Sequence, residues 1–206
     1  QDGVQGQMQM YLWTGSVPDS MVQITSSTSG TPASNTRFFA IQGSFAGPSQ
    51  PDLFTNPVLD KQIVIVQKNT LSTVGSSSEG CSSGQQSASF PPANDVTGKI
   101  VLIDRGSCSF VEKVLGAQEG RAAGVIVINN TPGQPIAMGG SDAPGNAITI
   151  PAVMVSRAVG TLLKAQITAG ATVIGSLKRR LPPAPKRDGD LDNGVISHEY
   201  GHGISS

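Results

Sequence analysis

Two histidines near the end of the chain have the spacing of a helical zinc site. The stretch "NGVISHEYGHGISS" places His198 and His202 four residues apart, with Glu199 beside the first. If this stretch is helical from about Asn193, whose side chain can cap the helix, both imidazoles project from one face and can bind zinc. Glu199 then lies next to that face, where a carboxylate polarises zinc-bound water and carries its proton. The pattern predicts zinc-dependent hydrolysis, with two histidine ligands and one catalytic glutamate.

This zinc site is incomplete within the chain. A catalytic zinc site needs three protein ligands and an open fourth position for water. Only residues 203–206, "GISS", follow His202, and none of them is a zinc ligand. We therefore expect the chain alone to bind zinc weakly and to be catalytically inactive. The alternative is a chance occurrence of "HEYGH" with two ordinary histidines.

An acidic stretch precedes the histidines and is a candidate for calcium binding. Asp188, Asp190 and Asp192 match the start of an EF-hand loop, and Glu199 falls at its twelfth position. The loop requires glycine at its sixth position, where this sequence has Asn193, so we do not expect an EF-hand. Weak calcium binding by the three aspartates remains a hypothesis. The alternative is a polar lead-in whose carboxylates favour the positive end of a helix.

The two cysteines, Cys81 and Cys108, allow a single pairing. Cys81 lies in the turn-rich stretch "SSSEGCSSGQQSAS", and Cys108 follows an apolar run in "DRGSCSF". Because the Gly-, Ser- and Pro-rich composition is typical of extracellular proteins, where thiols are oxidised, we predict a disulfide. Two reduced thiols are the alternative.

Composition narrows the class of protein. The chain has 206 residues, of which 37% are hydrophobic and 14% charged, with 14 basic residues balancing 14 acidic ones. This balance indicates neither a nucleic-acid nor a membrane partner, and no apolar run approaches the roughly 20 residues that span a bilayer. Together with a start at Gln1 rather than Met, the composition predicts a piece of a secreted protein. Asn129–Thr131, "NNT", is a glycosylation sequon.

Short apolar runs predict a β-rich fold. The stretches "MVQITS", "RFFAIQGSF", "KQIVIVQK" and "ATVIGSL" have strand patterns. Three continuous apolar runs are typical of strands buried on both faces, and we expect them to be neighbours in the core: Ile100–Ile103, Val125–Ile128 and Val153–Val155.

Two helices are predicted between these strands. Ser109 and Glu112 have the spacing of a capping box at the start of "SFVEKVLGAQEGRAAG", with Gly124 as the stop. Ser156 can cap a second helix through "RAVGTLLKAQITAG", which Gly170 ends. A helix between two buried strands implies a parallel pair. The expected fold class is α+β, predominantly β.

The order of these elements resembles the protease-associated (PA) domain. The stretches "GKIVLIDRGSCSFVEKVLGAQEGRAAGVIVINN" and "ITIPAVMVSRAVGTLLKAQI" carry the resemblance, which covers residues 16–181. It implies an open β-barrel or sandwich with a few peripheral helices and no catalytic residues of its own. It also implies a module of secreted hydrolases and sorting receptors that gates or assists substrate access. The implied partners are protein or peptide substrates and a parent peptidase domain.

The two ends of the chain resemble a different family. "MQMYLW" at Met8–Trp13 and "RDGDLDNGVISHEYGHGIS" at Arg187–Ser205 are similar to adjacent pieces of a fungalysin-type (M36) zinc metalloendopeptidase, whose third zinc ligand is a later Glu. This resemblance implies a peptidase flank at 1–15, an inserted PA domain at 16–181, and a linker with a truncated peptidase helix at 182–206. Two alternatives remain. One is a working metallopeptidase whose third ligand comes from elsewhere, and the other is a free-standing interaction module with an accidental "HEYGH".

Overall fold

The computed structural model describes residues 20–45, 51–67, 75–76, 78–81, 95–140 and 148–180. These residues belong to one compact unit, Pro18–Leu181. The predicted flanks, 1–15 and 182–206, lie outside the described residues, and the division into three segments stays a prediction. Within the described ranges the elements are β1 Ser20–Ser27, β2 Arg37–Gln42, β3 Ser44–Phe45, β4 Val58–Ile65, β5 Ile100–Asp104, α2 Phe110–Glu119, β6 Gly124–Ile128, β7 Gly139–Gly140, β8 Ala152–Val155, α3 Arg157–Thr168 and β9 Val173–Arg179.

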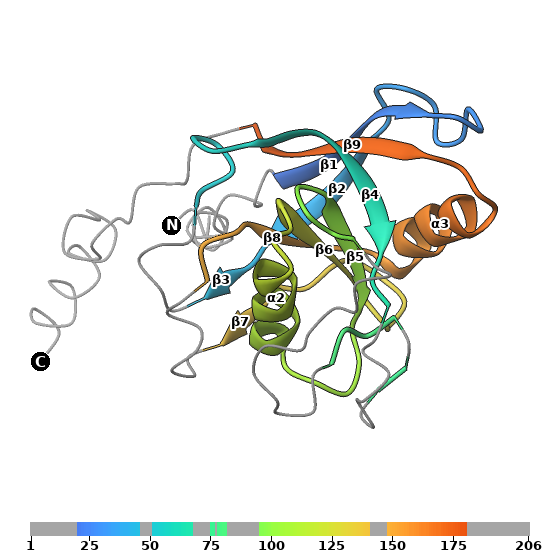
Figure 1. Ribbon diagram of the computed structural model, residues 1–206. Coiled ribbons are helices and arrows are strands. Elements are labelled where there is room, and N and C mark those ends of the chain that lie inside the picture. Colours follow the sequence, from blue (N-terminus) through green and yellow to red (C-terminus); the bar gives the residue numbers. More distant parts are fainter. Residues whose placement is uncertain are drawn as a thin grey trace, which may run out of the picture. The chain divides into compact units, whose positions relative to one another are not determined.

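Seven of the strands form a closed barrel in the order β1-β2-β8-β6-β5-β4-β9 (Figure 1). Strands β4, β5, β6 and β8 run parallel to one another, and β2 and β9 pair antiparallel with their neighbours. The carboxyl ends of the four parallel strands therefore meet at one end of the barrel. The predicted class, α+β and predominantly β, is confirmed. The barrel is closed rather than open, because β1 pairs with both β2 and β9.

The core has two parts because side chains alternate along each strand. One part fills the barrel and receives side chains from all seven strands, including Leu102 and Ile126, which are fully buried. The other lies on the outer face of β5, β6 and β8, where Val101 and Val125 pack beneath α2. Leu102 is paired with Ile126, and Ile126 with Val153. The three apolar runs are thus neighbouring buried strands, as predicted.

Helix α2 begins as predicted and ends earlier than predicted. The Ser109 hydroxyl accepts a hydrogen bond from the Glu112 backbone N–H at 3.1 Å. The helix stops at Gly120, and Arg121 then takes a left-handed φ of 61°. The prediction that Gly124 ends the helix is wrong, because Gly124 begins β6. There a Cβ would lie 2.9 Å from the Leu177 side chain, so the glycine serves strand packing.

Helix α3 lies against the end of β6. Ser156 caps it by accepting from the Val159 N–H at 3.4 Å, and Gly170 follows its end with a φ of 90°. A Cβ on Gly160 would lie 2.2 Å from the Ile128 side chain, so only glycine allows this close approach. The approach places the polar side of α3 beside the carboxyl ends of the parallel strands. In the described part of the chain, neither helix has the length and apolar character to span a membrane.

Candidate binding pocket

An open pocket of about 750 Å³ lies where β5 and β6 end. One wall is α3, and another is formed by Ser76 and Glu79. We call the described residues 76 and 78–81 the pocket segment. The carboxyl end of parallel strands is a common position for ligand sites in α/β sheets. Six polar or charged residues among those lining it are Glu79, Asp104, Arg105, Asn129, Arg157 and Lys164.

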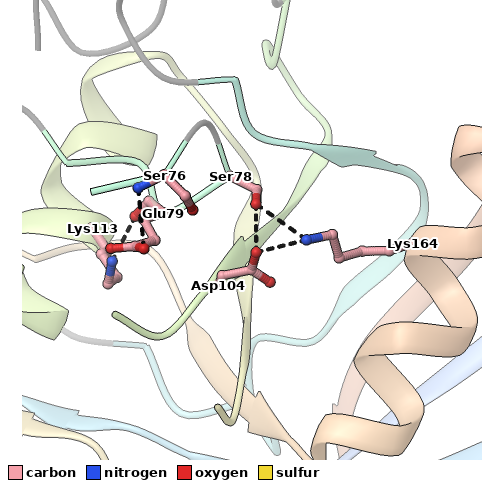
Figure 2. Close-up of polar contacts among 6 residues, drawn as sticks. All are labelled: Ser76, Ser78, Glu79, Asp104, Lys113 and Lys164. Carbon is pink, nitrogen blue, oxygen red and sulfur yellow. Dashed lines mark hydrogen bonds and ion pairs between the residues drawn. The ribbon is translucent and has the colours of Figure 1, made fainter. Parts of the chain in front are cut away.

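A three-residue clamp joins the pocket segment to α3 (Figure 2). Lys164 Nζ lies 2.6 Å from Asp104 Oδ2, and it donates a hydrogen bond to Ser78 Oγ at 3.1 Å. The Ser78 hydroxyl also donates to the same carboxylate oxygen of Asp104. A protonated amine that is bound to a carboxylate has no lone pair with which to accept the Ser78 proton. The clamp therefore holds the wall in place and does not activate a nucleophile.

Glu79 joins the pocket segment to the loop between β5 and α2. Its carboxylate accepts hydrogen bonds from the backbone N–H groups of Ser76 at 3.1 Å and Ser107 at 2.6 Å. A Cβ on Gly106 would lie 2.2 Å from this carboxylate, so glycine is needed there. Partial burial acts to raise the pKa of Glu79, but the hydrogen bonds from Ser107 and Ser76 outweigh it and lower the pKa to about 2.

We expect Glu79 to make stability depend on pH in the acid range. Its folded-state pKa is about 2, below the usual 4.5. The contribution of the Glu79 carboxylate to the free energy of unfolding is therefore fully present above pH 4.5. It is lost as the pH falls from 4.5 through about 2. Denaturant unfolding measures the free energy of unfolding of the wild type and of Glu79→Gln. The two values should differ most near neutral pH and become equal at about pH 2. Asp60 and Asp95, whose pKa values are also lowered, titrate in both proteins, so the difference isolates Glu79. A difference that does not change with pH contradicts this role.

Two arginines give the pocket its available positive charge. Arg105 Nη1 donates to Asn129 Oδ1 at 3.0 Å, and its guanidinium lies 5.8 Å from the centroid of the Phe110 ring. Arg157, at the start of α3, is exposed and takes part in none of the ion pairs among the described residues. Because Asp104 is paired and Glu79 is bound by N–H groups, the pocket suits carbonyl and carboxylate groups.

Asn129 orients an arginine and is not a glycosylation site. Its side chain is 1% exposed. Its Nδ2 donates to the Gln134 carbonyl at 3.1 Å, while its Oδ1 accepts from Thr131 as well as from Arg105. A glycan on this nitrogen has no room in the folded protein, so the sequon does not mark a usable acceptor.

Lys113 is a buried lysine that the sequence pattern did not reveal. It lies between apolar positions on α2, and its side chain is fully buried. Its Nζ donates to the Glu79 carbonyl oxygen at 2.6 Å. Burial is the main influence on the pKa of Lys113 and lowers it, while the carboxylates of Glu79, Glu112 and Asp104 act in the opposite direction.

The predicted site residues fall into two groups. Cys81 and Cys108 form the predicted disulfide, with an S–S distance of 2.04 Å, beside the pocket segment. The residues predicted to bind metal or act in catalysis lie outside the described residues: Asp188, Asp190, Asp192, His198, Glu199 and His202. The ranges that the structure does describe contain no group of three or more His, Cys, Asp or Glu able to hold a metal. Zinc and calcium binding remain predictions.

The barrel and its pocket match a known family. The PA domain profile matches residues 55–163, which include β5, α2, β6 and most of the pocket. The chain belongs to the PA domain family.

Relatives of the chain include peptidases and a receptor. It is 40% identical to vacuolar-sorting receptor 2 of Arabidopsis thaliana over 90 residues, which are 39% of this chain and 14% of that protein. It is 60% identical to leucine aminopeptidase 2 of Trichophyton rubrum over 42 residues, 20% of this chain and 8% of that protein. The structure of an aminopeptidase from Aneurinibacillus sp. strain AM-1 shares the fold, with a TM-score of 0.52 and 24% identity over 80% of this chain and 31% of that one.

These relatives are much longer than the chain, which spans less than a third of each. None of the three is a fungalysin-type peptidase, so they do not support that part of the resemblance. One of them is an aminopeptidase and another is a sorting receptor, and the solved structure shares the fold.

Proposed function

We propose that the chain is the PA domain of a secreted zinc peptidase and that its pocket binds segments of protein substrates. The observation that carries the binding role is the pocket itself, with the guanidinium groups of Arg105 and Arg157 on its wall. The names of the relatives, two aminopeptidases and a sorting receptor, support a module that serves proteins handling other proteins.

A peptide is the ligand that this pocket fits best. Its volume of about 750 Å³ is ample for a few residues, and it is open on one side. Arginine guanidinium groups donate in a fork that matches main-chain carbonyls and carboxylates. Arg105 is held in place by Asn129 and Phe110, whereas Arg157 is exposed and adaptable. We infer a preference for segments with an acidic side chain or a free terminal carboxylate.

The ends of the barrel support insertion into a larger protein. Ser20, the first residue of β1, is paired with Arg179, the last residue of β9. Neighbouring ends allow a domain to be inserted in a loop of another domain without disturbing it. Because β9 runs antiparallel to β4, this pair lies at the barrel end opposite the pocket. The pocket therefore faces away from the points where the chain enters and leaves the barrel.

The class of the parent peptidase rests on two different observations. The "HEYGH" motif and its flanks support a fungalysin-type endopeptidase with zinc on His198 and His202. The names of the relatives support an aminopeptidase. Cleavage of a peptide with a blocked amino terminus by the parent enzyme favours the first class, and a requirement for a free amine favours the second.

A peptide-retention experiment tests the binding role. The immobilised chain is incubated with a tryptic digest of casein, and the retained peptides are measured by mass spectrometry. We expect Arg157→Glu to reduce retention of carboxylate-rich peptides roughly tenfold or more, because a charge-assisted hydrogen bond is replaced by repulsion. Arg37→Glu makes the same charge change at an exposed position outside the pocket and should have no effect. Equal retention by the two variants contradicts the proposal.

The second candidate function is that the chain is itself a zinc peptidase. The "HEYGH" motif, with His198 and His202 as zinc ligands and Glu199 as the catalytic carboxylate, favours it. Intact casein incubated with the chain and zinc distinguishes the two functions. We expect no cleavage. Cleavage that disappears in Glu199→Gln makes the chain an enzyme.

A further inference from the structure

The Cys81–Cys108 disulfide lies beside two sources of positive potential. Cys108 directly precedes Ser109, the N-cap of α2, and so lies at the positive end of the helix dipole. Lys113 Nζ is 3.2 Å from Cys108 Sγ and 3.8 Å from Cys81 Sγ. A helix N-terminus and a neighbouring lysine both stabilise a thiolate relative to a thiol. The surroundings therefore favour the reduced, anionic form of Cys108.

While the disulfide is intact, no carboxylate of the described residues lies within ion-pair distance of Lys113. Its ammonium is bound by the Glu79 carbonyl oxygen, a neutral group, and none of the ion pairs among the described residues includes it. The Glu79 carboxylate favours the charge of Lys113 electrostatically, but burial outweighs it, so the ammonium is costly where it lies. Reduction of the disulfide creates a thiolate on Cys108 at contact distance from this ammonium, so the reduced protein gains the pair that the oxidised protein lacks.

The negative groups around the disulfide decide which sulfur carries the charge. Glu79 Oε2 lies 3.9 Å from Cys81 Sγ and disfavours a thiolate there. Glu112 on α2 and Asp104 at the end of β5 act on Lys113 at longer range. Cys81 is also buried, at 1% exposure, whereas Cys108 is partly exposed. The stable thiolate is therefore that of Cys108.

We propose that this disulfide is a site of thiol–disulfide exchange with small thiols of the glutathione class, and that its reduction weakens ligand binding in the pocket. The effect of reduction on ligand binding rests on the proposed function. In the first step a thiolate attacks Cys108 Sγ, a mixed disulfide forms, and Cys81 leaves as a thiolate. In the second step another thiol gives its proton to Cys81 and attacks the external sulfur. The products are an external disulfide, the Cys81 thiol and the Cys108 thiolate, and the two external thiols supply both electrons.

The pocket responds because its wall is fastened by this disulfide. The pocket segment carries Ser76 and Glu79 of the wall, and Ser78 of the clamp. Cys81 ends that segment, so the disulfide is its covalent link to the loop before α2. Figure 2 shows Lys113 beside Glu79. A Cys108 thiolate also competes with the Glu79 carbonyl for the Lys113 ammonium. Reduction therefore removes the disulfide that holds the pocket segment and weakens the hydrogen bond from Lys113 to the Glu79 carbonyl.

A redox titration tests the exchange site without reference to binding. The wild type, Lys113→Met and the control Lys99→Met are equilibrated in glutathione buffers, and free thiols are counted by alkylation and intact mass. Lys99 pairs with Asp95 away from the pocket. We expect Lys113→Met to be roughly tenfold harder to reduce, a shift of about 30 mV, and the control to match the wild type. Equal midpoints for Lys113→Met and the wild type overturn the proposal.

Single-cysteine variants test the same inference with Lys113 in place. Cys81→Ser leaves the Cys108 thiol, and Cys108→Ser leaves the Cys81 thiol. Thiolate absorbance at 240 nm should show Cys108 ionising below the ordinary pKa of about 8.5 and Cys81 ionising at or above it. The proposal is overturned if both thiols have the ordinary pKa, or if the pKa of Cys81 is the lower of the two. This test holds even if Lys113→Met does not fold.

Peptide retention by the oxidised and the reduced wild type tests control of the pocket. We expect retention of casein peptides to fall at least about fivefold on reduction and to return on reoxidation. Unchanged retention refutes the control of binding. If even the oxidised chain retains nothing, the proposed function and its redox control both fail, whereas the titration read by mass still decides the exchange site.

Discussion

Leu102→Ala is expected to lower the free energy of unfolding by about 2–5 kcal/mol, the range for a large-to-small change in a closed core. Leu102 is fully buried inside the barrel, where its neighbour in the register is Ile126. The surrounding strands are hydrogen-bonded into a closed ring and cannot collapse into the cavity. Denaturant melts measure the loss.

An exposed leucine provides the control for this change. Leu59 on β4 is 47% exposed, and Leu59→Ala should cost about 0.5 kcal/mol or less. Ile126→Ala, inside the barrel, should resemble Leu102→Ala. Losses below half a kilocalorie at both barrel positions mean that the core is elsewhere.

Removing the disulfide is expected to have the second largest effect on stability. Cys81 and Cys108 are 27 positions apart, and the chain-entropy model assigns a loop of this length about 3.5 kcal/mol. The double variant Cys81→Ser, Cys108→Ser should lose this amount, because its unfolded chain is no longer restrained. Thermal and denaturant unfolding of the two proteins provide the comparison, and equal stability contradicts a structural role for the bridge.

The parts of the fold that local patterns encode were predictable from the sequence. Three continuous apolar runs became β5, β6 and β8, since a strand buried on both faces needs apolar residues at every position. Ser109 and Ser156 both cap helices, because a capping hydroxyl acts within one turn of its own position. The disulfide followed from composition, which reflects the redox environment.

Local patterns were misleading where a residue serves a distant contact. Gly124 is of the residue type that commonly ends a helix. It is a glycine here because Leu177, on another strand, packs against it. Asn129 has the sequence of a glycosylation site, but it is buried and holds Arg105. A local pattern contains no information about which remote side chain will occupy the neighbouring space.

The sequence by itself determined the order of strands and helices, the family resemblance and the single cysteine pairing, all of which depend on neighbouring residues or on composition. The pocket and the burial of Lys113 were decided by tertiary structure. The pocket joins Glu79, Arg105 and Arg157, which are far apart in the chain and meet only because parallel strands end together at one end of the barrel. Lys113 is covered because the pocket segment, tied down by Cys81, lies over that face of α2. Closure of the barrel and the disulfide bring these groups together. Neither feature produces a repeating pattern of residue types that could be recognised in the sequence.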